Sequence, residues 1–293
     1  MKYVSFRPAS DSAAAPRAGA LSADGTAVLP LDGLCRGGDL LDLIGREAEA
    51  EAAAAKAAPV PLADVILLAP LPRPGRNIFC VGKNYHAHAE EFHRSGFDAS
   101  AGKDATPEFP IIFTKAPSTV TGPGAPIPSW LDYSDSTDYE GELAVIIGKG
   151  GRGISKAAAM DHVWGYTVAN DVTARNLQKD HRQWLIGKSI DGFCPMGPCI
   201  TPAADIPELG EMRLTTHVNG EKRQDAVLKD LIFDIPTLIE TISRVITLEP
   251  GDIILTGTPE GVGIGMVPPV YLVPGDTVRV EISGIGALEN MVA

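Results

Sequence analysis

The feature that most constrains the fold is a succession of short apolar segments, interrupted by glycine and proline, from Arg76 to the C-terminus. Apolar runs of roughly four to eight residues between such breakers are typical of β-strands. The predicted strands cover residues 77–81, 111–114, 142–147, 164–170, 199–201, 213–218, 252–256 and 277–282. Helical patterns are fewer, at residues 85–95, 155–163 and 235–246. Because strands and helices do not alternate strictly, the sequence predicts a β-rich α+β domain and disfavours a doubly wound parallel sheet.

The first 72 residues follow a different pattern. Residues 1–6 alternate like a strand, and the turn at 23–26 predicts a hairpin between residues 18–21 and 27–31. Asp39 is placed to cap a helix over residues 39–58, whose tail is rich in alanine and glutamate and predicts a solvated surface helix. A Pro- and Gly-rich segment ending at Gly75 then reads as a linker. We therefore expect a small N-terminal domain (1–72) and a catalytic domain (73–293).

Composition excludes some classes of protein. The 293 residues carry a formal net charge of -12, which argues against nucleic-acid binding because that requires clustered lysine and arginine. No apolar run is long enough to span a bilayer, and the start of the chain has no signal-peptide pattern. We expect a cytoplasmic protein that does not bind membranes. The four cysteines form no C-x-x-C pair, so they are expected to be buried, reduced and not zinc ligands.

Three carboxylates carry a first hint of chemistry. Glu140 and Glu142 are two residues apart on a predicted strand, so both side chains point to the same face. Two like charges side by side on a buried face repel each other unless a cation lies between them. Asp171 ends another largely apolar strand. These oxygen ligands favour Mg²⁺, Mn²⁺ or Ca²⁺ over zinc or copper. Taken alone, Glu140 and Glu142 also fit a solvated edge strand.

His88 and Glu91 form a second candidate pair. They are three residues apart and therefore neighbours on one face of the helix predicted over residues 85–95. A carboxylate beside an imidazole orients the ring and raises its basicity, as in a general base that activates water. His86 lies on another face from Glu91. When the pair is considered alone, an exposed polar helix start explains it better than a general base does.

Two further segments are rich in glycine and proline. Lys188 lies in what reads as a tight loop, and the segment 255–263 follows an apolar strand with a glycine-rich turn. This turn lacks the Lys-Ser/Thr of a nucleotide-binding P-loop. Asp132, Asp135 and Asp138 do not match the spacing of an EF-hand and are interpreted as turn formers and caps.

With these segments in view, the sequence resembles the fumarylacetoacetate hydrolase family, in its acylpyruvase and 2-hydroxyhepta-2,4-diene-1,7-dioate isomerase-like branch. The resemblance runs from about Arg76 to the C-terminus. Five segments carry it in the family's order: G-K-N-Y-x-x-H-x-x-E at 82–91, Y-E-G-E-L at 139–143, N-D-V-T-A-R-x-x-Q at 170–178, G-K-S at 187–189 with F-C-P-x-G-P at 193–198, and T-G-T-P-x-G-V-G at 256–263. One segment would be weak support, whereas the ordered set is specific.

The resemblance implies a mixed β-sandwich roll with a small N-terminal domain, commonly assembled as a homodimer. It implies that Glu140, Glu142 and Asp171 bind Mg²⁺ or Mn²⁺, with Ca²⁺ as a substitute in a crystal. It also implies that His88 and Glu91 activate water on a lid segment and that Lys188 is a third catalytic residue. Four further residues match positions that line the substrate pocket: Tyr85, Arg175, Gln178 and Thr258.

The implied activity is metal-dependent hydrolysis of a C–C bond in a small 2-oxo or 2,4-dioxo acid, such as an acylpyruvate from aromatic catabolism, with release of pyruvate. His88 would deprotonate the water that attacks the C4 carbonyl, and Lys188 and Gln178 would stabilise the developing negative charge. Oxaloacetate decarboxylation and dioate isomerisation on the same site stay open as alternatives. A non-catalytic metal-binding β-rich module is a remote alternative, because it would have no reason to keep the whole set of candidate residues.

The sequence departs from the family pattern at a few positions. Ile190 and Gly192 replace an aromatic residue and a threonine after G-K-S, and Glu260 stands where a small residue is commoner. A carboxylate at position 260 is expected to reshape the pocket or to repel a dianionic substrate. The segment 92–110 is longer than in the shortest relatives, and we expect it to form a mobile lid or a partner-contact loop.

Overall fold

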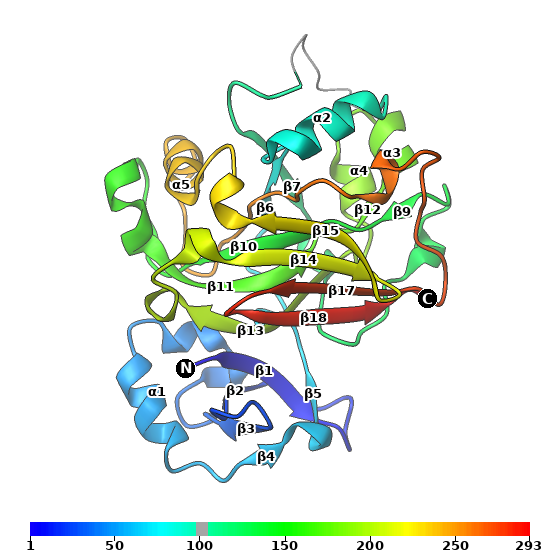
Figure 1. Cartoon of the computed structure of the whole chain (residues 1–293). Coiled ribbons are helices and arrows are strands. Elements are labelled where there is room, and N and C mark those ends of the chain that lie inside the picture. Colours follow the sequence, from blue (N-terminus) through cyan, green and yellow to red (C-terminus); the bar gives the residue numbers. More distant parts are fainter. Residues whose placement is uncertain (98–104) are drawn as a thin grey trace.

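The computed structural model describes residues 1–97 and 105–293, and three β-sheets dominate it (Figure 1). The strands of the largest sheet in this part of the chain are β1 (Tyr3–Pro8), β2 (Arg17–Leu21), β3 (Ala27–Pro30), β4 (Val60–Pro61), β5 (Val65–Leu67), β6 (Ile78–Gly82), β7 (Ile111–Lys115), β8 (Val120–Thr121), β10 (Gly141–Ile147), β11 (Val163–Asn170), β13 (Cys194–Pro202) and β16 (Ile253–Leu255). A small sheet pairs β9 (Thr137–Asp138) with β12 (Thr173–Ala174). The third sheet contains β14 (Arg213–Val218), β15 (Glu221–Val227), β17 (Thr277–Ile282) and β18 (Gly286–Met291).

Two of these sheets pack face to face. The large sheet runs in the order β4-β3-β2-β1-β13-β11-β10-β16-β6-β7, and the third sheet runs β15-β14-β17-β18 with antiparallel neighbours. Strands β14 and β17 contact β10 and β11, so the third sheet covers the centre of the large one (Figure 1). The prediction of a β-rich α+β fold is confirmed.

Strand β10 explains why the core lies on both sides of the large sheet. It runs between β11 and β16 and is antiparallel to both. Its residues Leu143, Val145 and Ile147 enter the apolar core beneath the third sheet, whereas Ala144 and Ile146 enter a second core that includes residues of the first 72 positions. A strand covered on both faces needs a continuous apolar run, as this segment has.

The helices are short. They are α1 (Glu47–Ala54), α2 (His86–Arg94), α3 (Arg175–Asp180), α4 (Leu185–Lys188) and α5 (Ile235–Ser243). The helices predicted at 85–95 and 235–246 are confirmed as α2 and α5. The single helix predicted over 39–58 is wrong, because a 3₁₀ helix at Leu40–Leu43 ends before Gly45, whose φ of 73° breaks the helix, and α1 begins after it. The segment predicted as a helix at 155–163 is a 3₁₀ helix at Lys156–His162.

The N-terminal residues join the same sheet as the rest of the chain. The predicted hairpin is confirmed as β2 and β3, with Ala20 opposite Leu29. Strand β1 then pairs with β13 through Tyr3 and Ile200. The domain boundary between residues 72 and 73 stays a prediction. All four cysteines are buried and free, as expected. In the described part of the chain, no helix combines the length and the apolar character that a membrane span requires.

Candidate metal and active site

Three carboxylates meet at one end of the central strands. Glu142 lies in β10, Glu140 precedes that strand, and Asp171 follows β11, in which Asn170 pairs with Gly141. One oxygen of each carboxylate lies within 4.8 Å of the others, and all three residues are buried. The shared face that the spacing predicts for Glu140 and Glu142 therefore points inward, and the alternative of a solvated edge strand is wrong.

Glu140 is surrounded by positive charge. Lys188 Nζ lies 2.7 Å from Glu140 Oε2 and 2.8 Å from Asp171 Oδ2, and Arg175 Nη1 lies 2.6 Å from Glu140 Oε1. Burial alone would raise the pKa of Glu140, but Lys188 and Arg175 outweigh it and lower that pKa to about 2. Glu140 is therefore ionised at neutral pH without any additional cation.

Glu142 has the opposite environment. Its Oε2 accepts a hydrogen bond of 2.6 Å from the Gly257 N–H, and no ion pair among the described residues involves its carboxylate. Burial, together with the nearby charges of Asp171 and Glu140, raises the pKa of Glu142 well above its usual value. A divalent cation among the three carboxylates would supply the missing positive charge, and oxygen ligands suit Mg²⁺ or Mn²⁺. The residues present thus fit such an ion.

Two buried residues that the sequence interpretation missed complete this network. Lys115, at the end of β7, places Nζ 2.8 Å from Asp171 Oδ1 and 3.0 Å from the Val172 carbonyl oxygen. Asp138 accepts a hydrogen bond of 2.9 Å from Arg175 Nε, a role beyond that of the turn former and cap expected from the sequence. A lysine that ends an apolar strand, as Lys115 does, was the available signal in the sequence.

His88 and Glu91 form the predicted pair on α2. His88 Nδ1 lies 3.2 Å from Glu91 Oε2, and Glu91 Oε1 accepts a hydrogen bond of 3.0 Å from the Gly261 N–H. His88 is 4% exposed, so the alternative of an exposed polar helix start is wrong, whereas His86 is exposed. When Nδ1–H donates to Glu91, Nε2 retains a free lone pair and can act as a base.

These groups surround a narrow cavity beneath three aromatic side chains. Trp184 contacts Phe92 and Phe113 edge to face, with centroid distances of 6.0 and 5.0 Å. The Trp184 ring lies so close to the backbone of Gly82 that a Cβ atom at position 82 would be 2.4 Å from it. The free space is about 20 Å³, which holds little more than one water molecule.

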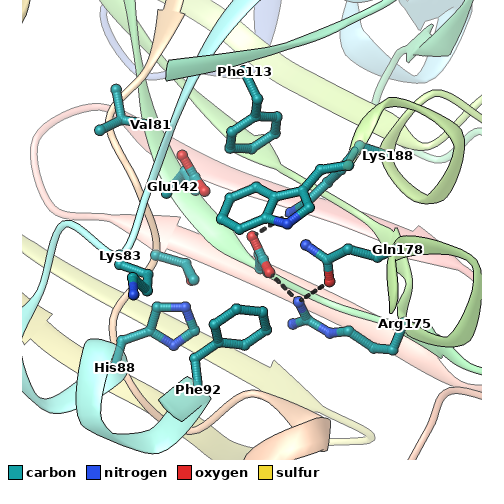
Figure 2. A pocket seen from close by; sticks show the side chains of 13 residues that line it. Val81, Lys83, His88, Phe92, Phe113, Glu142, Arg175, Gln178 and Lys188 are labelled. Carbon is teal, nitrogen blue, oxygen red and sulfur yellow. Dashed lines mark hydrogen bonds and ion pairs between the residues drawn. The ribbon is translucent and has the colours of Figure 1, made fainter. Parts of the chain in front are cut away.

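Most of the predicted site residues line this cavity. Figure 2 shows Lys83 and His88 on one side of the cavity and Lys188, Gln178 and Arg175 on the other. The predicted residues among its walls are His88, Glu140, Glu142, Arg175, Gln178, Lys188 and Thr258. Lys188 ends helix α4, so the tight loop predicted around it is wrong in this detail.

The remaining predicted residues lie behind the walls or have other partners. Glu91 does not line the cavity but contacts His88, and Asp171 likewise contacts Lys188. Tyr85 is buried outside the cavity wall, and burial raises its pKa. The Thr258 hydroxyl donates to the Gly141 carbonyl at 2.9 Å and accepts from Gln224 Nε2 at 2.8 Å. A substrate-binding role for Tyr85 and Thr258 stays a prediction.

The departures from the family pattern lie away from the cavity wall. Glu260 is exposed, and neither Ile190 nor Gly192 lines the cavity. Within the segment expected to form a lid, Phe92 belongs to α2, but residues 98–104 lie outside the described part of the chain. The expectation of a mobile lid or partner-contact loop there stays a prediction.

Comparisons with known proteins agree with this geometry. The family model described as fumarylacetoacetate (FAA) hydrolase C-terminal matches residues 77–293. Over 231 residues, which are 79% of this chain and 74% of the relative, the chain is 51% identical to the oxaloacetate tautomerase YisK of Bacillus subtilis (strain 168).

Solved structures extend the likeness to the whole chain. The fumarylacetoacetate hydrolase EaFAH from Exiguobacterium antarcticum is 41% identical, with a TM-score of 0.84 and coverage of 100% of this chain and 99% of that one. The maleylpyruvate hydrolase from Sphingobium sp. SYK-6, in complex with manganese(II) and pyruvate, is 31% identical, with a TM-score of 0.79 and the same coverage.

Proposed function

Because the chain belongs to the fumarylacetoacetate hydrolase family, we propose that its site binds Mg²⁺ or Mn²⁺ and interconverts the keto and enol forms of oxaloacetate or a closely related four-carbon 2-oxo acid. The observation that carries this proposal is that His88, hydrogen-bonded to Glu91, lines the same cavity as the carboxylates Glu140 and Glu142. A base therefore faces the candidate cation site, as proton transfer next to a carbonyl group requires.

Glu140, Glu142 and Asp171 would hold the ion. When bound, it would polarise the 2-oxo group as a Lewis acid and neutralise part of the carboxylate charge. The chain is 51% identical to a relative named an oxaloacetate tautomerase, which supports oxaloacetate as the first substrate to test.

His88 would move the proton. Its Nε2 takes a proton from C3 of the keto acid, the electrons of the C–H bond form the C2–C3 double bond, and negative charge develops on the 2-oxygen. The Lys188 ammonium, which lines the cavity, stabilises that charge. Return of the proton to the oxygen gives the enol, and the reverse sequence gives the ketone, so the reaction needs no other reactant.

Arg175 and Gln178 would orient the substrate. Arg175 is 1% exposed, and its Nη2 has no hydrogen-bond partner among the described residues. An unpaired guanidinium donor at a cavity wall suits a carboxylate of the substrate. Gln178 Oε1 accepts a hydrogen bond of 3.4 Å from Arg175 Nη1, which keeps the two side chains together.

The hydrolysis of a 2,4-dioxo acid, expected from the sequence, is the second candidate. The His88–Glu91 pair favours it, because the same base can deprotonate a water molecule instead of a carbon atom. The 31% identical maleylpyruvate hydrolase, in complex with manganese(II) and pyruvate, also supports this choice of assay. Decarboxylation of oxaloacetate would use the same enolate and is tested in the same way.

One experiment separates these reactions. Purified protein would be mixed with Mn²⁺ and with enol-oxaloacetate, oxaloacetate, acetylpyruvate or maleylpyruvate, with EDTA controls. Decay of the enol ultraviolet absorbance without pyruvate release, abolished in Glu142→Ala and His88→Ala, is the expected result. EDTA-sensitive pyruvate release from a dioxo acid would make hydrolysis the function, and release from oxaloacetate alone would indicate decarboxylation. Unchanged enol decay in His88→Ala would reject His88 as the base.

We also propose a homodimer. Residues 127–129 hydrogen-bond to the last residues of the chain, with Ile127 N–H donating to the Met291 carbonyl at 2.8 Å, and several large apolar side chains in and next to these segments are exposed. Trp130, Tyr133 and Met291 are each more than half exposed. Aromatic residues and methionine are enriched at subunit interfaces relative to the rest of a protein surface. Light scattering is expected to give twice the chain mass of 30.8 kDa, and Trp130→Asp is expected to lower it. A monomeric mass for the unaltered protein would contradict the proposal.

A further inference from the structure

A glycine-rich loop links the parts of the site that lie on different elements. Residues 257–265, called the strap here, donate backbone N–H groups to carboxylates from α2, β9 and β10. The hydrogen bonds run from Gly257 to Glu142 at 2.6 Å, from Gly261 to Glu91 at 3.0 Å, and from Gly263 and Ile264 to Asp138 at 2.8 and 3.0 Å. One short segment thus contacts a candidate metal ligand, the partner of the candidate base and the residue that holds Arg175.

Two of the four glycines of the strap are required by its backbone. Gly257 and Gly261 have φ values of 100° and 97°, a conformation that other residues rarely adopt. Gly265 is different, because its φ lies outside this region and alanine would fit the backbone there. The reason for glycine at position 265 therefore lies in its surroundings.

Those surroundings are the carboxyl group of Glu91. A Cβ atom at position 265 would lie 2.0 Å from Glu91 Oε1, 2.2 Å from Cδ and 2.4 Å from Cγ. All of the nearest atoms belong to this one side chain, and real Cβ atoms essentially never come within 3.0 Å of another group. An alanine at position 265 would therefore push the Glu91 carboxylate away from the Gly261 N–H and from His88.

We propose that Gly265 is a positioning residue for the reaction. Its missing side chain allows the Glu91 carboxylate to lie against the strap, where it accepts the Gly261 N–H and holds His88 Nδ1. This contact fixes the imidazole so that Nε2 is the basic nitrogen. The inference rests on the proposed function in one respect, namely that His88 is the base.

A double-mutant cycle tests the proposal with the metal-loaded enzyme. Gly265→Ala is expected to lower kcat on the order of 100-fold, as for a misplaced reacting group, while KM changes by less than about twofold. Glu91→Ala removes the clash together with the contact, so the double variant Gly265→Ala/Glu91→Ala is expected to match Glu91→Ala alone. Losses that add in the double variant, or unchanged kcat in Gly265→Ala, would overturn the proposal.

Gly210→Ala is the matched control. Gly210 also lies in a 3₁₀ helix, and a Cβ there would meet its nearest neighbour at an ordinary 3.5 Å. This variant is expected to retain the kcat of the unaltered protein. If Gly265→Ala fails to fold, the double variant still decides the question, because the alanine at 265 is expected to be tolerated once Glu91 is shortened. A double variant that also fails to fold would show that the methyl group clashes with something other than Glu91.

A measurement that needs no substrate separates this inference from the proposed function. The side-chain ¹⁵N chemical shifts of His88, in labelled protein with Mg²⁺, report which ring nitrogen carries the proton. We expect a single tautomer protonated at Nδ1 in the unaltered protein and a mixture in Gly265→Ala and Glu91→Ala. Identical shifts in all variants would overturn the positioning role. Failure to turn over any tested acid, with the expected shifts, would instead reject the proposed function alone.

Discussion

Glu140 and Glu142 are separated by a single glycine and point to the same cavity, yet their surroundings move their pKa values in opposite directions. Burial acts on both carboxyl groups, but of these two residues only Glu140 forms ion pairs with Lys188 and Arg175. Glu142 receives one backbone hydrogen bond and the repulsion of Asp171 and Glu140. The electrostatic strain of the metal-free site is therefore concentrated on Glu142.

The metal-free protein should become less stable as the pH rises. The folded-state pKa of Glu142 is raised above its unfolded value of 4.5. The contribution of Glu142 to the free energy of unfolding is therefore fully present below pH 4.5 and is lost as the pH rises toward the folded-state pKa. In EDTA, Glu142→Gln is expected to melt a few degrees higher than the unaltered protein at pH 8 and at nearly the same temperature at pH 4.5. Differential scanning fluorimetry across this range measures the effect, with the exposed Glu208→Gln as control.

Metal should reverse this order of stability. An ion present at about 100 times its Kd stabilises the folded state by about 2.7 kcal/mol. For a domain of this size that corresponds to a rise in Tm of about 5–10 °C. We expect Mn²⁺ to raise the Tm of the unaltered protein by this amount and that of Glu142→Gln by much less. An equal rise in both proteins would show that Glu142 is not a ligand.

Lys115 should be required for folding stability. Its fully buried ammonium pairs with Asp171 and donates to the Val172 carbonyl, and it also contacts the Lys188 carbonyl. Lys115→Met would leave these buried acceptors without their donor, at a cost of about 3–5 kcal/mol. Urea unfolding at pH 7 with EDTA measures the loss. Lys149→Met, at an exposed position, is expected to change the free energy of unfolding by less than about 0.5 kcal/mol.

Substrate binding should depend on the guanidinium geometry of Arg175 and not only on its positive charge. Its guanidinium contacts Asp138 through Nε and Glu140 through Nη1, an arrangement that an ammonium group cannot reproduce. Arg175→Lys is expected to raise KM for a dicarboxylic substrate about tenfold or more, because a charge-assisted hydrogen bond to the substrate is lost. Steady-state kinetics of this variant and of the exposed Arg152→Lys test the prediction. Equal KM values would contradict it.

Phe92 should limit the chain length of the 2-oxo acids that the site accepts as substrates. It lines the cavity, lies 6.2 Å from the His88 ring and contacts Trp184. Phe92→Leu is expected to favour longer 2-oxo acids, raising kcat/KM for acetylpyruvate relative to oxaloacetate about tenfold, since one methylene group is worth about 1–3 kcal/mol in such a pocket. Competition between the two acids in one reaction measures the ratio directly. A ratio that falls would place the substrate tail elsewhere.

The sequence predicted those parts of the site that depend on local periodicity. The common face of Glu140 and Glu142 follows from the two-residue repeat of a strand, and the pairing of His88 with Glu91 follows from the helical repeat. The mixed sandwich roll of the family, predicted from the resemblance, is confirmed by the fold and by the solved relatives.

The parts that were missed depend on contacts between distant segments. The lysine at the end of an apolar strand marks Lys115 as unusual, but nothing local to Lys115 or Asp138 identifies Asp171 and Arg175 as their partners. Strand β15 was not predicted, because its sequence EKRQDAV is polar. The strand lies at the edge of its sheet, where most of its side chains are only partly buried or exposed. The position of Gly265 against Glu91 likewise appears only once the chain has folded.

The pairing of β1 with β13 has a consequence for protein engineering. The first residues of β13 pair with β8, whereas its segment from Cys199 onward pairs with β1. A shortened version that begins at residue 73 would leave that edge open to strands of other molecules. Removing the N-terminal segment, however dispensable it looks from the cavity, is therefore a route to insoluble material unless a substitute strand caps the exposed edge.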